Sequence, residues 1–107
     1  MGRSIGDLPI DWDPEKAAEN ISRHQGVTFE EGSTVFQDPL SKTFLDPQHA
    51  EGEWRSLDVG YSNRGRRLIV SSTERQGRIR IMNARRVTRK ERRLYEEGEG
   101  PAPRIRG

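Results

Sequence analysis

Three runs of alternating apolar and polar residues, joined by short turns, constrain the fold of this 107-residue chain more than any other feature. The runs cover residues 55–61, 67–73 and 78–84, and apolar side chains recur at alternate positions within them. A period of two is typical of a strand with one buried face. Gly65 and Gly77 lie in the two short connections, where tight reversals favour glycine. The sequence therefore predicts an antiparallel meander of three strands.

An N-terminal helix is predicted by residues that favour a helix start. Asp13 is a good N-cap, and Pro14 suits the first helical position because its missing N–H would have no partner there. We expect this helix to extend to about residue 24. Apolar residues recur within it at helical spacing and predict its buried face, which comprises Ala17, Ala18 and Ile21.

Two further helices are predicted by capping boxes, in which a Thr hydroxyl and a Glu carboxylate three residues later each accept a backbone N–H. Thr28 and Glu31 predict a short helix that extends to Phe36. Thr88 and Glu91 predict a C-terminal helix that follows the meander.

These elements predict an α+β domain over residues 10–98, with helices on one face of a mainly antiparallel sheet of about four strands. Short strands are expected at residues 10–12, as an edge strand, and at residues 42–45. We expect residues 1–9 to be a flexible N-terminus. Residues 99–107 contain several Pro and Gly residues and are expected to be a mobile tail.

Charge is distributed unevenly along the chain, although the net charge is only +2. Residues 1–53 carry 4 Lys or Arg and 11 Asp or Glu, whereas residues 54–107 carry 15 and 6. The cations of the second half are nearly all arginine, whose planar guanidinium binds phosphate through paired hydrogen bonds. A folded arginine-rich face indicates an anionic partner, with RNA or DNA as the first candidate and an acidic protein as the second.

The composition also argues against several classes of protein. The chain has no cysteine, which excludes disulfides and thiolate metal sites, and its 2 histidines are far apart, so we expect no structural zinc and no cofactor. The longest apolar stretch is Leu68-Ile69-Val70, far too short to span a membrane. No apolar signal region is visible at the N-terminus. We therefore expect a soluble cytoplasmic protein.

Short blocks of residues follow one another in a characteristic order. The first half contains Asp13-Pro14-x-Lys16-Ala17-x-x-Asn20, Arg23-His24, Gly26-Val27-Thr28-Phe29-Glu30-Glu31 and Val35-Phe36-x-Asp38-Pro39. The second half contains Glu53-x-Arg55, Gly60-x-Ser62-x-x-Gly65-Arg66-x-Leu68, Thr73-x-Arg75, Ile79-Arg80-Ile81-x-x-Ala84-Arg85 and Glu91-Arg92-x-x-Tyr95. Together these blocks resemble the BrnT toxin family over about residues 10–98. The chain departs from the usual pattern at Gln25, Gly32 and Met82-Asn83.

The resemblance implies the toxin half of a type II toxin–antitoxin pair, related to the RelE-type ribonucleases that cleave RNA without metal and inhibit translation. The implied substrate is RNA, with ribosome-associated mRNA among the candidates. The implied partner is a BrnA-like antitoxin, which neutralises the toxin and forms a heterotetramer with it. Operator DNA would be contacted through the antitoxin alone.

Metal-free RNA cleavage needs a base for the 2′-hydroxyl proton, positive charge for the phosphate and an acid for the leaving 5′ oxygen. Arg80 is the candidate for the phosphate, because it lies mid-strand on the face opposite Ile79 and Ile81. The alternative is a solubilising residue on an exposed face of the sheet, and the resemblance favours the phosphate. Arg85 ends the same strand and either joins this site or pairs with an acid of the N-terminal half. His24 is a candidate general acid or base, or else a helix C-terminal histidine that interacts with the helix dipole.

Glu53 is the remaining catalytic candidate, as a base or as a partner for a neighbouring arginine. The candidate RNA-binding residues are Lys16, Arg55, Arg66, Arg75 and Arg78, each of which is otherwise an ordinary surface charge. His49 lies in a polar loop and is expected to be ordinary surface. The alternative for the whole chain is a non-catalytic arginine-rich module that binds nucleic acid or an acidic protein. An exposed arginine face also predicts an antitoxin segment that carries carboxylates.

Overall fold

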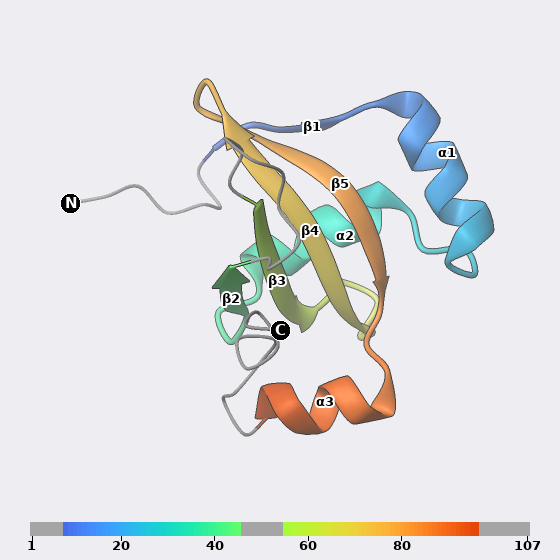
Figure 1. The fold of residues 1–107 in the computed structure, drawn as a ribbon, viewed down its shortest axis with the longest axis vertical. Coiled ribbons are helices and arrows are strands. Elements are labelled where there is room, and N and C mark those ends of the chain that lie inside the picture. Colours follow the sequence, from blue (N-terminus) through green and yellow to red (C-terminus); the bar gives the residue numbers. More distant parts are fainter. Residues whose placement is uncertain (1–7, 46–54, 97–107) are drawn as a thin grey trace.

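The computed structural model describes residues 8–45 and 55–96, which form five strands, three α-helices and one 3₁₀ helix (Figure 1). In chain order these elements are β1 (Ile10–Trp12), α1 (Pro14–Arg23), α2 (Phe29–Ser33), the 3₁₀ helix η2 (Thr34–Gln37), β2 (Lys42–Leu45), β3 (Arg55–Tyr61), β4 (Arg67–Arg75), β5 (Arg78–Arg86) and α3 (Arg89–Glu96). The predictions for Glu53, His49 and most of the two chain ends lie outside the described residues.

The strands form one sheet in the order β1-β5-β4-β3-β2. Strands β2 to β5 pair antiparallel, so the predicted meander and the α+β class are confirmed. Strand β1 pairs parallel with β5, with Ile10 opposite Ile79. The sheet therefore has five strands rather than about four, because residues 10–12 join it as the expected edge strand.

The β4–β5 pair contains a β-bulge at Met82, which has no partner on β4. Arg80 pairs with Thr73 on one side of the bulge, and Arg85 pairs with Ile69 on the other. Thr73 and Ile69 are four residues apart on a strand without an extra residue, so their side chains leave the same face of the sheet. Arg80 and Arg85 therefore share that face, which strict alternation along β5 would not allow.

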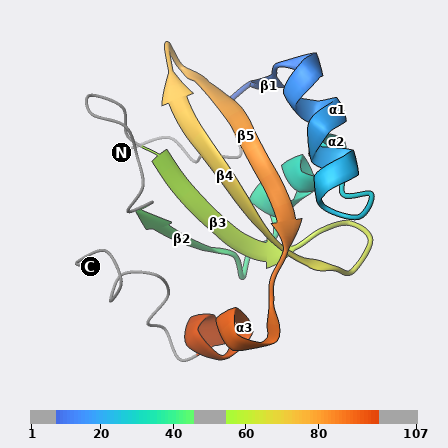
Figure 2. The same ribbon diagram turned by 45° about the vertical axis from the view of Figure 1, so that its right-hand side comes forward.

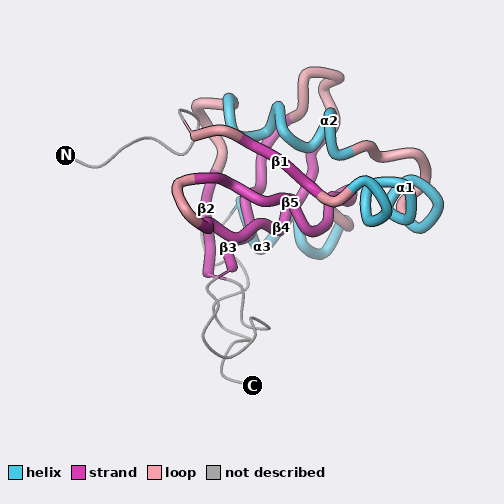
Figure 3. The backbone as a smooth tube through the Cα atoms, turned by 90° about the horizontal axis from the view of Figure 1, so that it is seen from above, coloured by secondary structure: helices cyan, strands magenta, loops and turns pink. Residues whose placement is uncertain are grey.

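Two apolar clusters lie on opposite faces of the sheet. The larger packs α1 and α2 against the sheet and comprises Val27, Phe29, Val35, Leu68, Val70, Ile81 and Ala84. The smaller packs α3 against the other face and comprises Val59, Ile69 and Tyr95, with Phe44, Leu57 and Val87 beside them. Figure 3 shows α2 and α3 on opposite sides of the strands. The prediction that all helices cover one face is wrong for α3, because β4 is apolar on both faces.

Helix α1 begins as predicted, since the Asp13 carboxylate accepts the N–H of Glu15 at 2.9 Å. Ala17 of the predicted buried face packs against the core, but Ile21 is 44% exposed and Ala18 is also exposed. Asn20 is buried instead. The helix lies beside β5, and the side chain of Asn20 faces the backbone of that strand.

The Thr28 half of the first capping box is confirmed, since the Thr28 hydroxyl accepts the N–H of Glu31 at 2.9 Å. The Glu31 carboxylate instead accepts hydrogen bonds from Ser62 and Arg66. The predicted single helix divides into α2 and the 3₁₀ helix η2. A Cβ atom on Gly32 would lie 3.0 Å from the Cβ of Ala84. Glycine at this position therefore allows α2 to approach β5 closely. This close packing accounts for a glycine that helix propensity alone would disfavour.

Asp58 on β3 is a buried carboxyl, with 2% of its surface exposed. Its Oδ1 accepts the hydroxyl of Thr43, whereas its Oδ2 has no hydrogen bond. Burial raises the pKa of Asp58 to about 6. The folded state therefore binds this proton more tightly than the unfolded chain does.

We expect Asp58→Asn to remove a pH dependence of stability. In the wild type the stabilising effect of protonation is fully present below the ordinary pKa of 3.8 and is lost as the pH rises through about 6. Relative to the variant, the free energy of unfolding should fall by about 3 kcal/mol in total, from a pH well below 3.8 to a pH well above 6. Urea denaturation across the same range measures this difference, and parallel curves for the two proteins would contradict it.

Candidate functional site

Four arginines lie on the sheet face that carries α3. They belong to the start of β3, the end of β4 and the start of β5, and Figure 2 shows these strand ends far from α3. Thr73 of β4 pairs with Arg55 on one side and with Arg80 on the other, and Arg75 pairs with Arg78. Residues that pair across neighbouring strands project from the same face. The structure thus brings together four of the predicted residues, and we call them the arginine face: Arg55, Arg75, Arg78 and Arg80.

Asp11 of β1 adjoins the arginine face. Its Oδ1 lies 3.5 Å from Nη1 of Arg80, and its Oδ2 lies 3.9 Å from Nη1 of Arg78. Charge-assisted hydrogen bonds are about 2.7–2.9 Å long, so these ion pairs are loose. A cavity of about 90 Å³ lies between Asp11, Arg75, Gln76, Arg78 and Arg80. The guanidinium groups around it can bind a further anion.

His24 follows the last residue of α1 and faces β5. Its Nε2 lies 3.3 Å from Nδ2 of Asn83. Burial lowers the pKa of His24 below its ordinary value of 6.5, and the charges of Arg85 and Arg23 lower it further. The imidazole is therefore neutral at pH 7 and can accept a proton. A groove of about 240 Å³, which we call the His24 groove, is lined by Arg23, His24, Gln25, Arg85, Arg86 and Thr88.

Arg85 pairs with an acid, but that acid is Glu91 of the C-terminal half, so the predicted pairing with an acid of the N-terminal half is wrong. Its Nη1 and Nη2 donate to Oε1 and Oε2 of Glu91 at 2.9 and 2.7 Å, and it also lines the His24 groove. This pairing lowers the pKa of Glu91 to about 2. Glu91 also accepts the N–H of Thr88 in the predicted capping box. The start of α3 therefore holds the guanidinium of Arg85 in a defined position.

The turn after α1 contains Gln25, one of the departures from the usual family pattern. Gln25 has a φ of 55° and Gly26 a φ of 86°, so two successive residues adopt the left-handed conformation. The N–H of Gly26 donates to the carbonyl of Ile21, and the N–H of Val27 donates to the carbonyl of His24. These bonds hold the tight turn that follows His24.

Arg66 lies elsewhere and has an ordinary structural explanation. Its Nε donates to Oε2 of Glu31 at 2.9 Å, and its Nη2 donates to Oε1 of the same carboxylate. The hydroxyl of Ser62 also donates to Glu31. This cluster ties the β3–β4 turn to α2, so the role of Arg66 in RNA binding stays a prediction. Lys16 is exposed on α1, two turns before His24.

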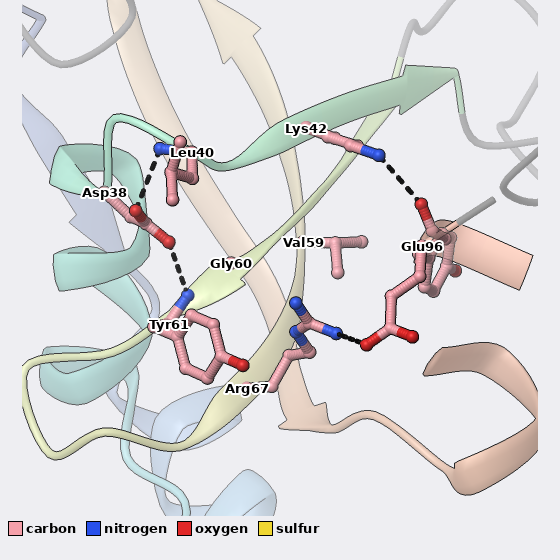
Figure 4. A pocket seen from close by; sticks show the side chains of 9 residues that line it. Asp38, Leu40, Lys42, Val59, Gly60, Tyr61, Arg67 and Glu96 are labelled. Atoms are coloured by element: carbon pink, nitrogen blue, oxygen red, sulfur yellow. Dashed lines mark hydrogen bonds and ion pairs between the residues drawn. The ribbon is translucent and has the colours of Figure 1, made fainter. Parts of the chain in front are cut away.

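A separate groove of about 290 Å³ lies between β3, β4 and α3 (Figure 4). Asp38 accepts the N–H groups of Leu40 and Tyr61 there. Arg67 pairs with Glu96 at 2.9 Å. None of the predicted site residues that the structure describes lines this groove.

Three residues near the predicted site were missed by sequence reasoning: Asp11, Asn20 and Asn83. Asn20 carried a signal, because it lies three residues after Ala17 and four before His24, on one face of a helix. No signal in the sequence indicated Asp11 or Asn83, because their contacts come from strand pairing and from the bulge.

In the part of the chain that the structure describes, no group of three or more His, Cys, Asp or Glu side chains is arranged to hold a metal ion. None of the described helices is both long and apolar enough to cross a membrane.

Comparison with known families identifies the chain. Residues 12–91 match the family described as the ribonuclease toxin BrnT of a type II toxin–antitoxin system. The chain belongs to the BrnT family. The resemblance in the sequence is thereby confirmed, and family membership implies a ribonuclease toxin with an antitoxin partner.

A solved structure has the same fold. The 1.1 Å crystal structure of the Brucella abortus ribonuclease toxin BrnT is similar with a TM-score of 0.56 and 18% sequence identity. The similarity covers 77% of this chain and 99% of that chain. No curated protein matches this chain significantly.

We expect Arg85→Gln to raise the pKa of His24, because the charge of Arg85 is one of the causes that lower it. NMR titration of the His24 ring measures the change. Arg86→Gln is the matched control, since Arg86 lines the same groove and is not among those causes. Equal shifts in the two variants, or none in Arg85→Gln, would contradict the electrostatic account of this site.

Proposed function

We propose that this BrnT-family chain is a metal-independent endoribonuclease that binds RNA along β5, between the arginine face and the His24 groove. One observation carries the proposal. The bulge at Met82 turns Arg80 and Arg85 to the same face of the sheet, and His24 contacts Asn83 between them.

The substrate that fits this arrangement is a stretch of single-stranded RNA. Five residues of a strand extend over roughly 15 Å, so Arg80 and Arg85 bind different phosphates of one chain. Arg55, Arg75 and Arg78 extend the positive surface beyond Arg80. Such contacts bind the backbone without reading the bases.

In the proposed reaction the neutral imidazole of His24 takes the proton of a 2′-hydroxyl. The 2′ oxygen then forms a bond to phosphorus as the bond from phosphorus to the 5′ oxygen breaks. The products are a 2′,3′-cyclic phosphate and a 5′-hydroxyl. Arg85, held by Glu91, supplies positive charge for the reacting phosphate in the transition state. Arg80 binds a neighbouring phosphate of the same chain and positions the RNA. Glu53 remains the second acid–base candidate, for the proton that the 5′ oxygen requires.

The antitoxin partner in this proposal is BrnA-like. Charge complementarity favours an antitoxin segment whose carboxylates occupy the arginine face in place of RNA phosphates. The antitoxin would also form a heterotetramer with the toxin, and only the antitoxin would contact operator DNA in this complex.

Cleavage of a labelled RNA in EDTA tests the proposed reaction. We expect the wild type to produce 2′,3′-cyclic phosphate ends, and Arg80→Gln to lower the rate by about 10²-fold, because the RNA loses a contact that positions its reacting phosphate beside His24. Arg89→Gln, on the exposed face of α3, is the matched control and should retain the wild-type rate.

If the wild type leaves free RNA intact, the same proteins are tested in a translation assay on intact ribosomes. Cleavage of ribosome-bound mRNA alone would support a ribosome-dependent enzyme. Salt-sensitive RNA binding without cleavage in either assay would refute catalysis and favour the non-catalytic binding module.

Growth of cells that express the chain alone tests toxicity. We expect growth arrest by the wild type, relief of arrest by Arg80→Gln or Arg85→Gln, and recovery on co-expression of a BrnA-like antitoxin. Immunoblots must show equal amounts of folded toxin. Arrest by both variants would refute the assignment of these arginines.

A further inference from the structure

Asn20 is a buried polar side chain in the middle of α1, with 3% of its surface exposed. Its Nδ2 donates to the carbonyl of Ala84 at 2.7 Å and to that of Val27 at 3.0 Å. Its Oδ1 accepts the N–H of Ala84 at 3.1 Å. The amide therefore uses both of its N–H groups and its oxygen, which few other side chains can do.

These bonds continue the sheet where its edge strand stops. Strand β1 pairs with residues 79–81 of β5, after which the chain turns into α1 (Figure 1). Ala84 lies beyond that pairing, and its N–H and C=O both bond to Asn20. The side-chain amide thus takes the place of the peptide group that a longer β1 would have supplied.

The position of His24 depends on the same amide. His24 is one turn after Asn20, and its backbone N–H donates to the backbone carbonyl of Asn20 at 2.9 Å. Val27, the other residue bonded to the side-chain amide, lies just beyond the turn that follows His24. Ala84 lies between Asn83 and Arg85, the two β5 residues that act on the imidazole. Asn20 therefore fixes the backbone on both sides of His24 and the strand opposite it.

We propose that Asn20 is a positioning residue for RNA cleavage, which holds the end of α1 against β5 so that His24 keeps its place beside Asn83 and Arg85. The proposal rests on the proposed role of His24 as the base. No part of the reaction passes through Asn20 itself. Leucine has a similar shape but cannot form any of the three bonds, and aspartate lacks both donors.

Asn20→Leu tests the proposal without adding a charge near His24. Release of the imidazole from its partly buried position should raise its pKa towards 6.5. NMR titration of the His24 ring measures this increase. The acidic limb of the cleavage rate should move to higher pH with it. The kcat should fall about tenfold or more, with little change in KM, because a small displacement of a catalytic group lowers the rate steeply.

Ser22→Ala, an exposed position on the same helix, is the matched control and should change none of these quantities. Asn20→Ser retains one possible donor and replaces Asn20→Leu if the latter does not fold. Amide hydrogen exchange at Ala84, slow in the wild type and faster in the folded variant, reports loss of the bonds directly.

A folded Asn20 variant with an unchanged His24 pKa and kcat would overturn the proposal. Failure of the proposed function gives a different result. In that case His24→Gln would cleave RNA at the wild-type rate, while the His24 pKa in Asn20→Leu would still show whether Asn20 positions the imidazole.

Discussion

Pairing between β4 and β5, with one extra residue at Met82, is the constraint on which the candidate site depends. In a regular ladder Arg85 would share a face with Ile81, and its guanidinium would enter the apolar cluster under α1 and α2. The bulge changes the alternation, so Ala84 enters that cluster and Arg85 faces the other side. Beyond the end of β1, the N–H and C=O of Ala84 bond to Asn20 instead of to an edge strand, which brings α1 and His24 to the same stretch of β5.

The uneven charge of the sequence has a structural counterpart. Acids of the N-terminal half reach arginines of the other half, but they do so unequally. Glu31 is buried and binds Arg66 closely, whereas Asp11 lies at 3.5 Å or more from Arg78 and Arg80. Loose pairing leaves Arg78 and Arg80 able to bind phosphate, whereas Arg66 is part of the fold. Arg85 differs from both, because Glu91 binds it closely while it lines the His24 groove.

Local signals in the sequence predicted most of the helices and strands. They failed where contacts between residues far apart in the chain determine the structure. Capping boxes and alternation located the helices and the strands of the meander, and the resemblance identified the family. Alternation has a fixed period and cannot report an extra residue, so the bulge at Met82 was missed. Ile21 was placed in the core because it is apolar, but the helix face that meets β5 needs a hydrogen-bonding group. That group, Asn20, bonds to a residue 64 positions away, which no local pattern encodes.

NMR mapping of an uncleavable RNA, with a 2′-deoxy nucleotide in place of the reactive one, tests the location of the site most directly. The account predicts that the side chains of Arg78, Arg80, Arg85 and His24 change their chemical shifts together on binding, whereas that of Arg66 does not. Changes gathered around Arg66 and Glu31, or on the outer surface of α3, would show that RNA binds elsewhere and would contradict the account.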